Sequence, residues 1–162
     1  NMRLIDYLET RGDIAMDDLG CFGFSGGGYM TLYLAALDPR VRKAFVSGYL
    51  YGVGDSLLHL NGNCSCNYTP GLWRLLDMGD IASLVAPRPL LVQSCEEDHL
   101  NGVRGLKNVD EQLKIVRDAY ELLGRRGGLR HEVCPGGHHL GVAHLAEDIE
   151  WLDSQVAECA HA

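Results

Sequence analysis

A serine, an acid and a histidine occur in an order that could support nucleophilic catalysis. Ser25 lies in the stretch Gly-Phe-Ser-Gly-Gly at 23–27, between a short apolar run and a helix-forming run. Asp98 and His138 each lie just after a later apolar run. A serine hydroxyl is a weak nucleophile until a histidine accepts its proton and an acid orients the imidazole. The three residues together therefore indicate hydrolysis through an acyl-enzyme intermediate, a reaction that needs no cofactor.

The glycines around Ser25 favour a sharp turn from a strand into a helix. Side chains at Gly23 and Gly27, two residues on either side, are expected to clash with the neighbouring backbone. The backbone N–H of Gly26, at the start of the helix, is the natural first donor to an oxyanion. A glycine-rich turn without chemistry has the same composition. A phosphate-binding loop is disfavoured, because the stretch lacks both the Gly-Lys-Ser/Thr ending and the G-x-G-x-x-G spacing.

The acid and the histidine each have neighbours that could replace them. We favour Asp98 over Glu96 and Glu97, since its place in the loop leaves room for the chain to turn back toward the sheet. We favour His138 over His139, because two glycines precede His138 and allow the backbone to approach closely. In an extended loop, the side chain of His139 would point to the other side.

Composition and charge restrict the class of protein. The chain has 162 residues, 46% of them hydrophobic, which suits one globular domain. A formal net charge of -8 argues against nucleic acid and against an anionic membrane surface as partners. No apolar run approaches the length of about 18 residues that a transmembrane helix needs, and the first residues do not resemble a signal peptide. We therefore expect a cytoplasmic protein.

Apolar runs and amphipathic segments alternate along the chain. This alternation predicts an α/β fold with a parallel sheet, in which each candidate residue follows a strand. The expected strands are 19–24, 44–48, 90–94 and 130–134, and the expected helices are 3–11, 29–37, 80–85, 108–124 and 142–156.

The segment 49–80 shows no clear periodicity. So long an irregular stretch in a compact domain is usually functional, so we interpret it as an insertion over the active-site end of the sheet. Tyr49, Tyr51, Tyr68 and Trp73 are candidates to line a substrate pocket there. Packing of these aromatics against the sheet is an equally good explanation.

Two of the six cysteines form a C-x-C pair in the same segment, at Cys64 and Cys66. With His59 nearby they could hold a metal, yet no second pair of ligands is evident, so no metal site is expected. Reduced thiols are the favoured interpretation.

Five motifs together resemble one branch of a known superfamily. They are GFSGGG at 23–28, SGYLY at 47–51, CSCNYTPGL at 64–72, DIASLVAPRPLL at 80–91 and GGH at 136–138. In combination they resemble the α/β-hydrolases, in the branch of acetyl xylan esterases and dienelactone-hydrolase-like enzymes. The resemblance implies hydrolysis of a small carboxylic ester, most simply acetyl, with Ser25, Asp98 and His138 at the triad positions. A peptidase or a lactone hydrolase with the same triad is the alternative enzyme.

The resemblance also implies that only the C-terminal half of the domain is present. In the complete fold, further strands and a second oxyanion donor precede the serine. The strand before Ser25 would then have an open edge, which a missing N-terminal half, a partner chain or an oligomer could cover. A non-catalytic half-domain that acts as an interaction module is the third hypothesis.

Overall fold

The computed structural model describes residues 1–59 and 62–159. Within these ranges four strands form one parallel sheet in the order β1-β2-β3-β4. The strands are β1 (Gly20–Phe24), β2 (Lys43–Ser47), β3 (Leu90–Cys95) and β4 (Leu129–Cys134). The predicted α/β fold is confirmed, with strand ends within one residue of those expected from the apolar runs.

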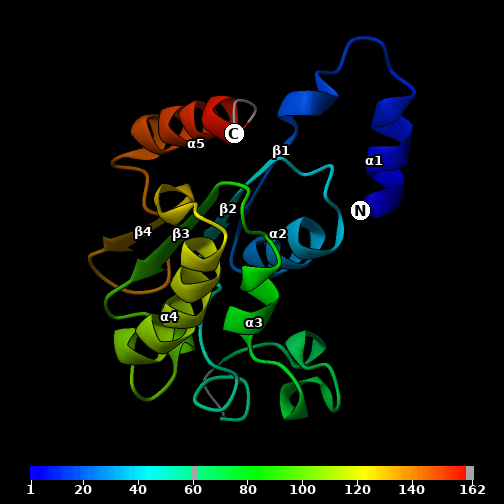
Figure 1. Ribbon diagram of the computed structural model, residues 1–162. Helices are drawn as coiled ribbons and strands as arrows, with labels where there is room; N and C mark the ends of the chain where they lie inside the picture. Colours follow the sequence, from blue (N-terminus) through cyan, green and yellow to red (C-terminus); the bar gives the residue numbers. More distant parts are fainter. Residues whose placement is uncertain (60–61, 160–162) are drawn as a thin grey trace.

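Helices cover both faces of the sheet (Figure 1). They are α1 (Met2–Glu9), α2 (Gly26–Leu37), α3 (Met78–Ser83), α4 (Leu106–Leu122) and α5 (Leu145–Cys159). Side chains alternate between the two faces along each strand. Val46 and Val92 therefore join the large core beneath α2, α3 and α4, whereas Phe45 and Leu91 pack against Leu152 of α5.

Each helix begins one to three residues from its predicted position, and the causes are clearest at α3 and α5. Helix α3 begins at Met78 rather than at residue 80, because Asp77 caps it and Asp80 completes a reciprocal capping box. Helix α5 begins at Leu145 rather than at residue 142, after a turn. Short 3-10 turns at Ser65–Asn67 and Leu72–Arg74 interrupt the irregular segment. The interpretation of 49–80 as a cover over the site stays a prediction.

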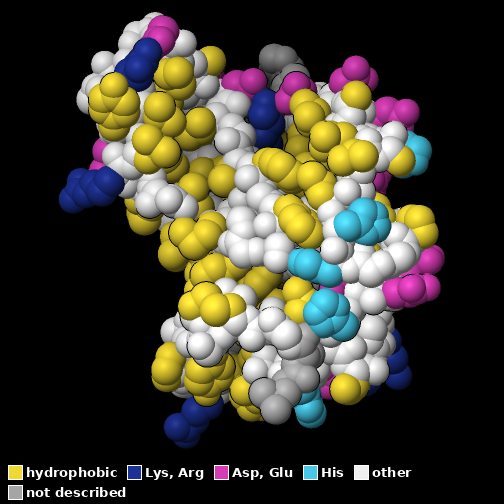
Figure 2. All heavy atoms as spheres, turned by 180° about the vertical axis from the view of Figure 1, so that it is seen from behind, with side chains coloured by type: hydrophobic (Ala, Val, Ile, Leu, Met, Phe, Trp, Pro, Cys, Tyr) yellow, Lys and Arg dark blue, Asp and Glu magenta, His cyan; other side chains and the backbone are white. Residues whose placement is uncertain are grey.

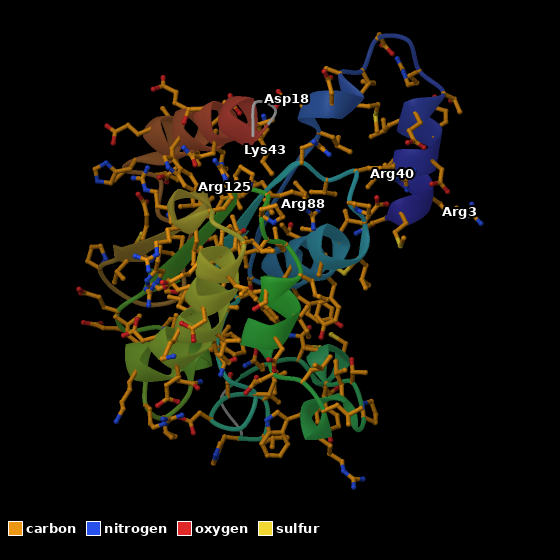
Figure 3. The ribbon with its side chains drawn as sticks, viewed as in Figure 1. Arg3, Asp18, Arg40, Lys43, Arg88 and Arg125 are labelled. Carbon is orange, nitrogen blue, oxygen red and sulfur yellow. The ribbon has the colours of Figure 1, made fainter. Side chains whose placement is uncertain are left out.

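Ion pairs join elements at the end of the sheet opposite the carboxyl ends of the strands. Lys43 Nζ, at the start of β2, lies 2.6 Å from both Asp18 and Asp153, which come from the segment before β1 and from α5. Figure 3 shows Lys43 beside Asp18. Arg40, which follows α2, pairs with Asp38 and also with Glu9 of α1. These contacts hold α1 and α5 to the sheet and leave the carboxyl ends of the strands for the site.

Strand β1 is an edge of the sheet. It pairs with β2 on one side, and no strand in the part of the chain that the structure describes pairs with its other side. An apolar hollow of about 240 Å³ lies between β1 and α5, and another of about 280 Å³ lies between β1 and α1. Phe22 in β1 is 51% exposed. Figure 2 shows hydrophobic side chains over much of the face seen from behind.

No helix within the described ranges is both long and apolar enough to cross a membrane.

Candidate active site

Ser25 occupies a strained turn between β1 and α2. Its φ of 56° and ψ of -120° make it the one residue other than glycine with positive φ among those described. Such a conformation costs about 1–3 kcal/mol and persists only where the surroundings impose it. The Ser25 N–H donates to the carbonyl of Ser47 in β2, at 2.9 Å. This bond holds the turn against the next strand, with Ser25 half-buried.

Crowding around the turn occurs at only one of the two predicted glycines. A Cβ atom at Gly23 would lie 2.1 Å from the carbonyl oxygen of Gly27, so that position requires glycine. A Cβ atom at Gly27 would meet nothing within 4 Å, so the prediction of a clash there was wrong. The second crowded position is Gly28, where a Cβ atom would lie 2.8 Å from the carbonyl oxygen of Ser47. Gly28 faces the sheet, whereas Gly27 lies on the exposed side of the first helical turn.

Ser25, His138 and Asp98 form a continuous hydrogen-bonded chain. The distance from His138 Nε2 to Ser25 Oγ is 2.8 Å, and the distance from His138 Nδ1 to Asp98 Oδ2 is 2.6 Å. Asp98 is only 3% exposed. A carboxylate that accepts from Nδ1–H leaves Nε2 free to accept the serine proton. The geometry is therefore that of a nucleophile, a general base and an orienting acid.

The alternative acids and histidine lie elsewhere. Glu96 and Glu97 are exposed. His139 is also exposed, and its Nδ1 lies 2.8 Å from the carbonyl oxygen of Gly137. The structure brings Asp98 and His138 to Ser25 and leaves the three alternatives exposed, outside this hydrogen-bonded chain.

A short 3-10 turn at His99–Asn101 fixes the acid. Asp98 precedes this turn, and its Oδ1 accepts the N–H of Leu100 at 2.9 Å. The Asn101 amide donates to the carbonyl of Cys95 at the end of β3, at 3.0 Å. Ser56, from the irregular segment, donates its hydroxyl to the carbonyl of Leu100. The acid loop is thus tied to both β3 and the segment 49–80.

Two residues that position the histidine were missed from the sequence. The Phe24 ring stacks on the His138 imidazole, with centroids 4.7 Å apart. Gly48 has a φ of 63°, and a Cβ atom there would lie 3.1 Å from His138 Cε1. A glycine as the last residue of a predicted strand was a usable signal for Gly48. Phe24 lay inside the recognised motif, but nothing in the sequence identified its partner.

The start of α2 supplies the candidate oxyanion donor. Gly26 is the first residue of this 12-residue helix and is exposed. N–H groups in the first helical turn have no partner within the helix, and they lie at the positive end of its dipole. The assignment of the Gly26 N–H to the oxyanion stays a prediction.

The predicted pocket aromatics do not line the site. Tyr49 and Tyr51 are 1% and 0% exposed and belong to the core, so their assignment to a pocket was wrong. Burial raises the pKa of both phenols. Tyr68 and Trp73 are about half exposed and line a small hollow, yet its lining contains no residue of the Ser25 site. The first two rings turn inward because the chain after β2 continues into the core before it reaches the surface.

Cys64 and Cys66 lie on the surface with their sulfur atoms 2.8 Å apart. The hydrogen bond from Cys66 lowers the pKa of Cys64. Among the described residues, no group of three or more His, Cys, Asp or Glu side chains is placed to hold a metal ion.

A strand that runs into a sharp serine turn and then a helix, followed along the chain by an acid loop and a histidine loop, is the arrangement of the α/β-hydrolase fold. The chain has this fold. Methylesterase BT1017 superposes with a TM-score of 0.70 at 24% identity, over 97% of this chain and 33% of that one. A glucuronoyl esterase from Solibacter usitatus superposes with a TM-score of 0.73 at 19% identity, over 95% of this chain and 46% of that one.

One curated protein resembles the chain in sequence. It is named "Putative hydrolase YtaP", from Bacillus subtilis (strain 168), and is 28% identical over 82% of this chain and 49% of its own length. The chain thus spans about half of this relative and less than half of the two solved structures. No model of a protein family matches the chain.

Proposed function

We propose that this chain carries the catalytic residues of a serine hydrolase that cleaves a small carboxylic ester. The observation that carries the proposal is the unbroken chain of hydrogen bonds from Asp98 through His138 to Ser25, at 2.6 and 2.8 Å. Similarity in structure to esterases and in sequence to a hydrolase supports the same class of reaction.

The proposed reaction has two halves. Ser25 Oγ attacks the ester carbonyl carbon while its proton passes to His138 Nε2, and Asp98 stabilises the resulting imidazolium. The Gly26 N–H donates to the oxyanion. The intermediate collapses, the alcohol leaves with the proton from His138, and the acyl group stays on Ser25. Water then attacks this acyl group and loses a proton to His138. His138 returns a proton to Ser25 Oγ as the bond to the acyl group breaks, which releases the acid and regenerates the serine.

The acyl group that we propose is acetyl, because five motifs of the chain resemble the branch that contains acetyl xylan esterases. The names of the two structural neighbours suggest other esters, a methyl ester and a glucuronoyl ester. A panel of matched esters separates these substrates: an aryl acetate, the aryl butyrate, and the methyl ester of a uronic acid. We expect the highest kcat/KM for the acetate and none for the Ser25→Ala variant. Faster hydrolysis of the uronate ester would overturn the acetyl assignment and retain the esterase.

The same panel tests the alternative functions. An anilide and a lactone report on a peptidase or a lactone hydrolase, which share the triad but differ in the leaving group. If none of these substrates is hydrolysed even when a further segment pairs with the open edge of β1, a non-catalytic interaction module is favoured.

We also propose that a further segment completes the sheet beside β1, either the N-terminal half of a longer chain or a partner chain. The open edge, the apolar hollows on its two faces and the partial span of the relatives support this proposal. In the complete fold, a loop of that segment supplies the second oxyanion donor. Co-expression with the corresponding N-terminal half of the curated relative is expected to raise ester hydrolysis. An unchanged rate in a stable complex would contradict the proposal.

A cytoplasmic location fits the described cysteines, since the side chains of Cys21, Cys64, Cys66, Cys95 and Cys134 are free thiols. Fractionation of the native cells tests this part of the proposal.

A further inference from the structure

A buried glutamine in β3 holds the loop that carries the histidine. Gln93 is 2% exposed. Its side chain accepts the N–H of Gly141 through Oε1 and donates to the Gly141 carbonyl through Nε2, both at 3.0 Å. The amide side chain thus pairs with the Gly141 backbone as a neighbouring strand would.

This pairing occurs beyond the end of β4, where the chain has left the sheet. Strand β4 ends at Cys134, and His138 lies in the loop between β4 and α5. Gly141 follows His138 by three residues and is buried. A Cβ atom at Gly141 would lie 2.2 Å from Cys134 Sγ and 3.1 Å from Gln93 Nε2, so a side chain there would displace both groups. The loop is therefore attached to β3 at Gly141, just before α5 begins.

The same glutamine is linked to the serine turn. Gln93 Oε1 also accepts the hydroxyl of Ser47, at 2.8 Å. The carbonyl of Ser47 accepts the N–H of Ser25, at 2.9 Å. One hydrogen-bonded path thus runs from the Ser25 turn through β2 and β3 to the His138 loop.

We propose that Gln93 is a positioning residue that sets the place of His138 relative to Ser25. This inference rests on the proposed function, because it concerns the same triad. Without the amide, the buried N–H and C=O of Gly141 would have no partner, and a buried polar group without a partner is costly. The loop would move to find one, and His138 would move with it.

The test replaces Gln93 with methionine, which has a similar volume and lacks both amide groups. Gln112→Met is the matched control, because Gln112 is also buried and bonded to the backbone N–H of Gly79, but it lies in α4 and holds no part of the triad. The first readout is the downfield proton NMR signal of His138 Nδ1–H bonded to Asp98. The second is the rate at which a fluorophosphonate labels Ser25.

We expect Gln93→Met to lose the downfield signal and to slow labelling by about tenfold or more. Gln112→Met is expected to lower the unfolding temperature and to keep both the signal and the rate. A signal and a rate in Gln93→Met equal to those of the wild type would overturn the inference.

Two further outcomes keep the inference separate from folding and from the proposed function. Hydrogen exchange of the Gly141 N–H in the wild type needs no variant: slow exchange supports the bond to Gln93, and exchange at the rate of a free amide overturns it. If the wild type shows the downfield signal but is not labelled, the proposed function fails. The inference then depends on whether Gln93→Met loses that signal.

Discussion

At the scale of single residues, the proposed hydrolysis depends on the protonation state of the His138 imidazole. His138 must present Nε2 without a proton to Ser25, and this tautomer requires Nδ1–H to be held by an acceptor. Asp98 is that acceptor, buried and fixed by the Leu100 N–H. The exposed Glu97, one residue earlier in the chain, makes no comparable contact with the imidazole.

Replacement of the acid tests this dependence. Asp98→Asn keeps the shape of the side chain but can hold the wrong tautomer, so kcat is expected to fall by up to about 10⁴-fold with little change in KM. Glu97→Gln removes a neighbouring exposed charge and is the control, with kcat expected to match the wild type. Steady-state kinetics on an aryl acetate measures both. A large loss in Glu97→Gln with none in Asp98→Asn would reassign the acid.

At the scale of elements, the β1–α2 turn is held by contacts between backbones. The strained Ser25 conformation is possible because Gly23 and Gly28 let helix α2 approach the strands. Changes at glycines in this one turn are therefore expected to have unequal effects.

Gly23→Ala and Gly27→Ala form a matched pair. The first places a methyl group 2.1 Å from the Gly27 carbonyl oxygen, and it is expected to destabilise the fold by about 3 kcal/mol or more. The second meets open space within a helix, and it is expected to be neutral or to stabilise by up to about 1 kcal/mol. Urea unfolding measures both free energies. Equal effects would mean that backbone crowding does not shape the turn.

Strand β4 carries a half-buried histidine, His131, that should make stability depend on pH. Burial lowers the pKa of His131 to about 4, from an ordinary value of 6.5. Between these values the unfolded chain binds a proton that the folded chain does not, so the free energy of unfolding falls as the pH is lowered. The slope for this group is at most about 1.4 kcal/mol per pH unit.

Comparison with a variant isolates this effect. Burial raises the pKa of Asp148 to about 6, which acts in the opposite direction over an overlapping range, so the wild-type curve alone is ambiguous. His131→Gln removes one of the two groups. Relative to the wild type it is expected to be more stable at pH 5 than at pH 7.5, by about 2 kcal/mol. The exposed His144→Gln is the control, and an unchanged difference between the two pH values would contradict the assignment.

At the scale of the whole molecule, the candidate site lies at the carboxyl ends of the strands, and the outer edge of β1 has no partner strand within the described ranges. Among the described residues, β1 and β4 are the two edge strands of the sheet, and the apolar hollows flank β1. Exposed edges of this kind pair with other chains.

The unpaired edge of β1 predicts that the isolated chain associates with itself. Phe22→Lys places a charge in the apolar hollow beside β1 and is expected to shift the protein toward monomer. Leu122→Lys, at a site 86% exposed at the end of α4, is the control and is expected to behave as the wild type. Sedimentation velocity over a range of concentrations distinguishes them. A wild type that stays monomeric at every concentration would show that the open edge of β1 does not mediate self-association.

Much of this organisation could be predicted because it is local in the sequence. The short runs at 19–24, 44–48, 90–94 and 130–134 predicted the strands, and the order of Ser25, Asp98 and His138 predicted which side chains come together. Residues that act through distant partners could not be predicted. Gln93 is a polar residue in an apolar strand, and nothing near it in sequence indicates Gly141. Tyr51 was misplaced because a loop composition does not reveal that the chain turns into the core.

The central claim is that Ser25 is a nucleophile activated by His138. The most direct measurement is reaction of the chain with a fluorophosphonate, followed by peptide mass spectrometry to locate the adduct. We expect an adduct on Ser25 that is lost in His138→Ala and kept in His139→Ala. An adduct on another residue, or equal labelling of Ser25 in the wild type and in His138→Ala, would contradict the account.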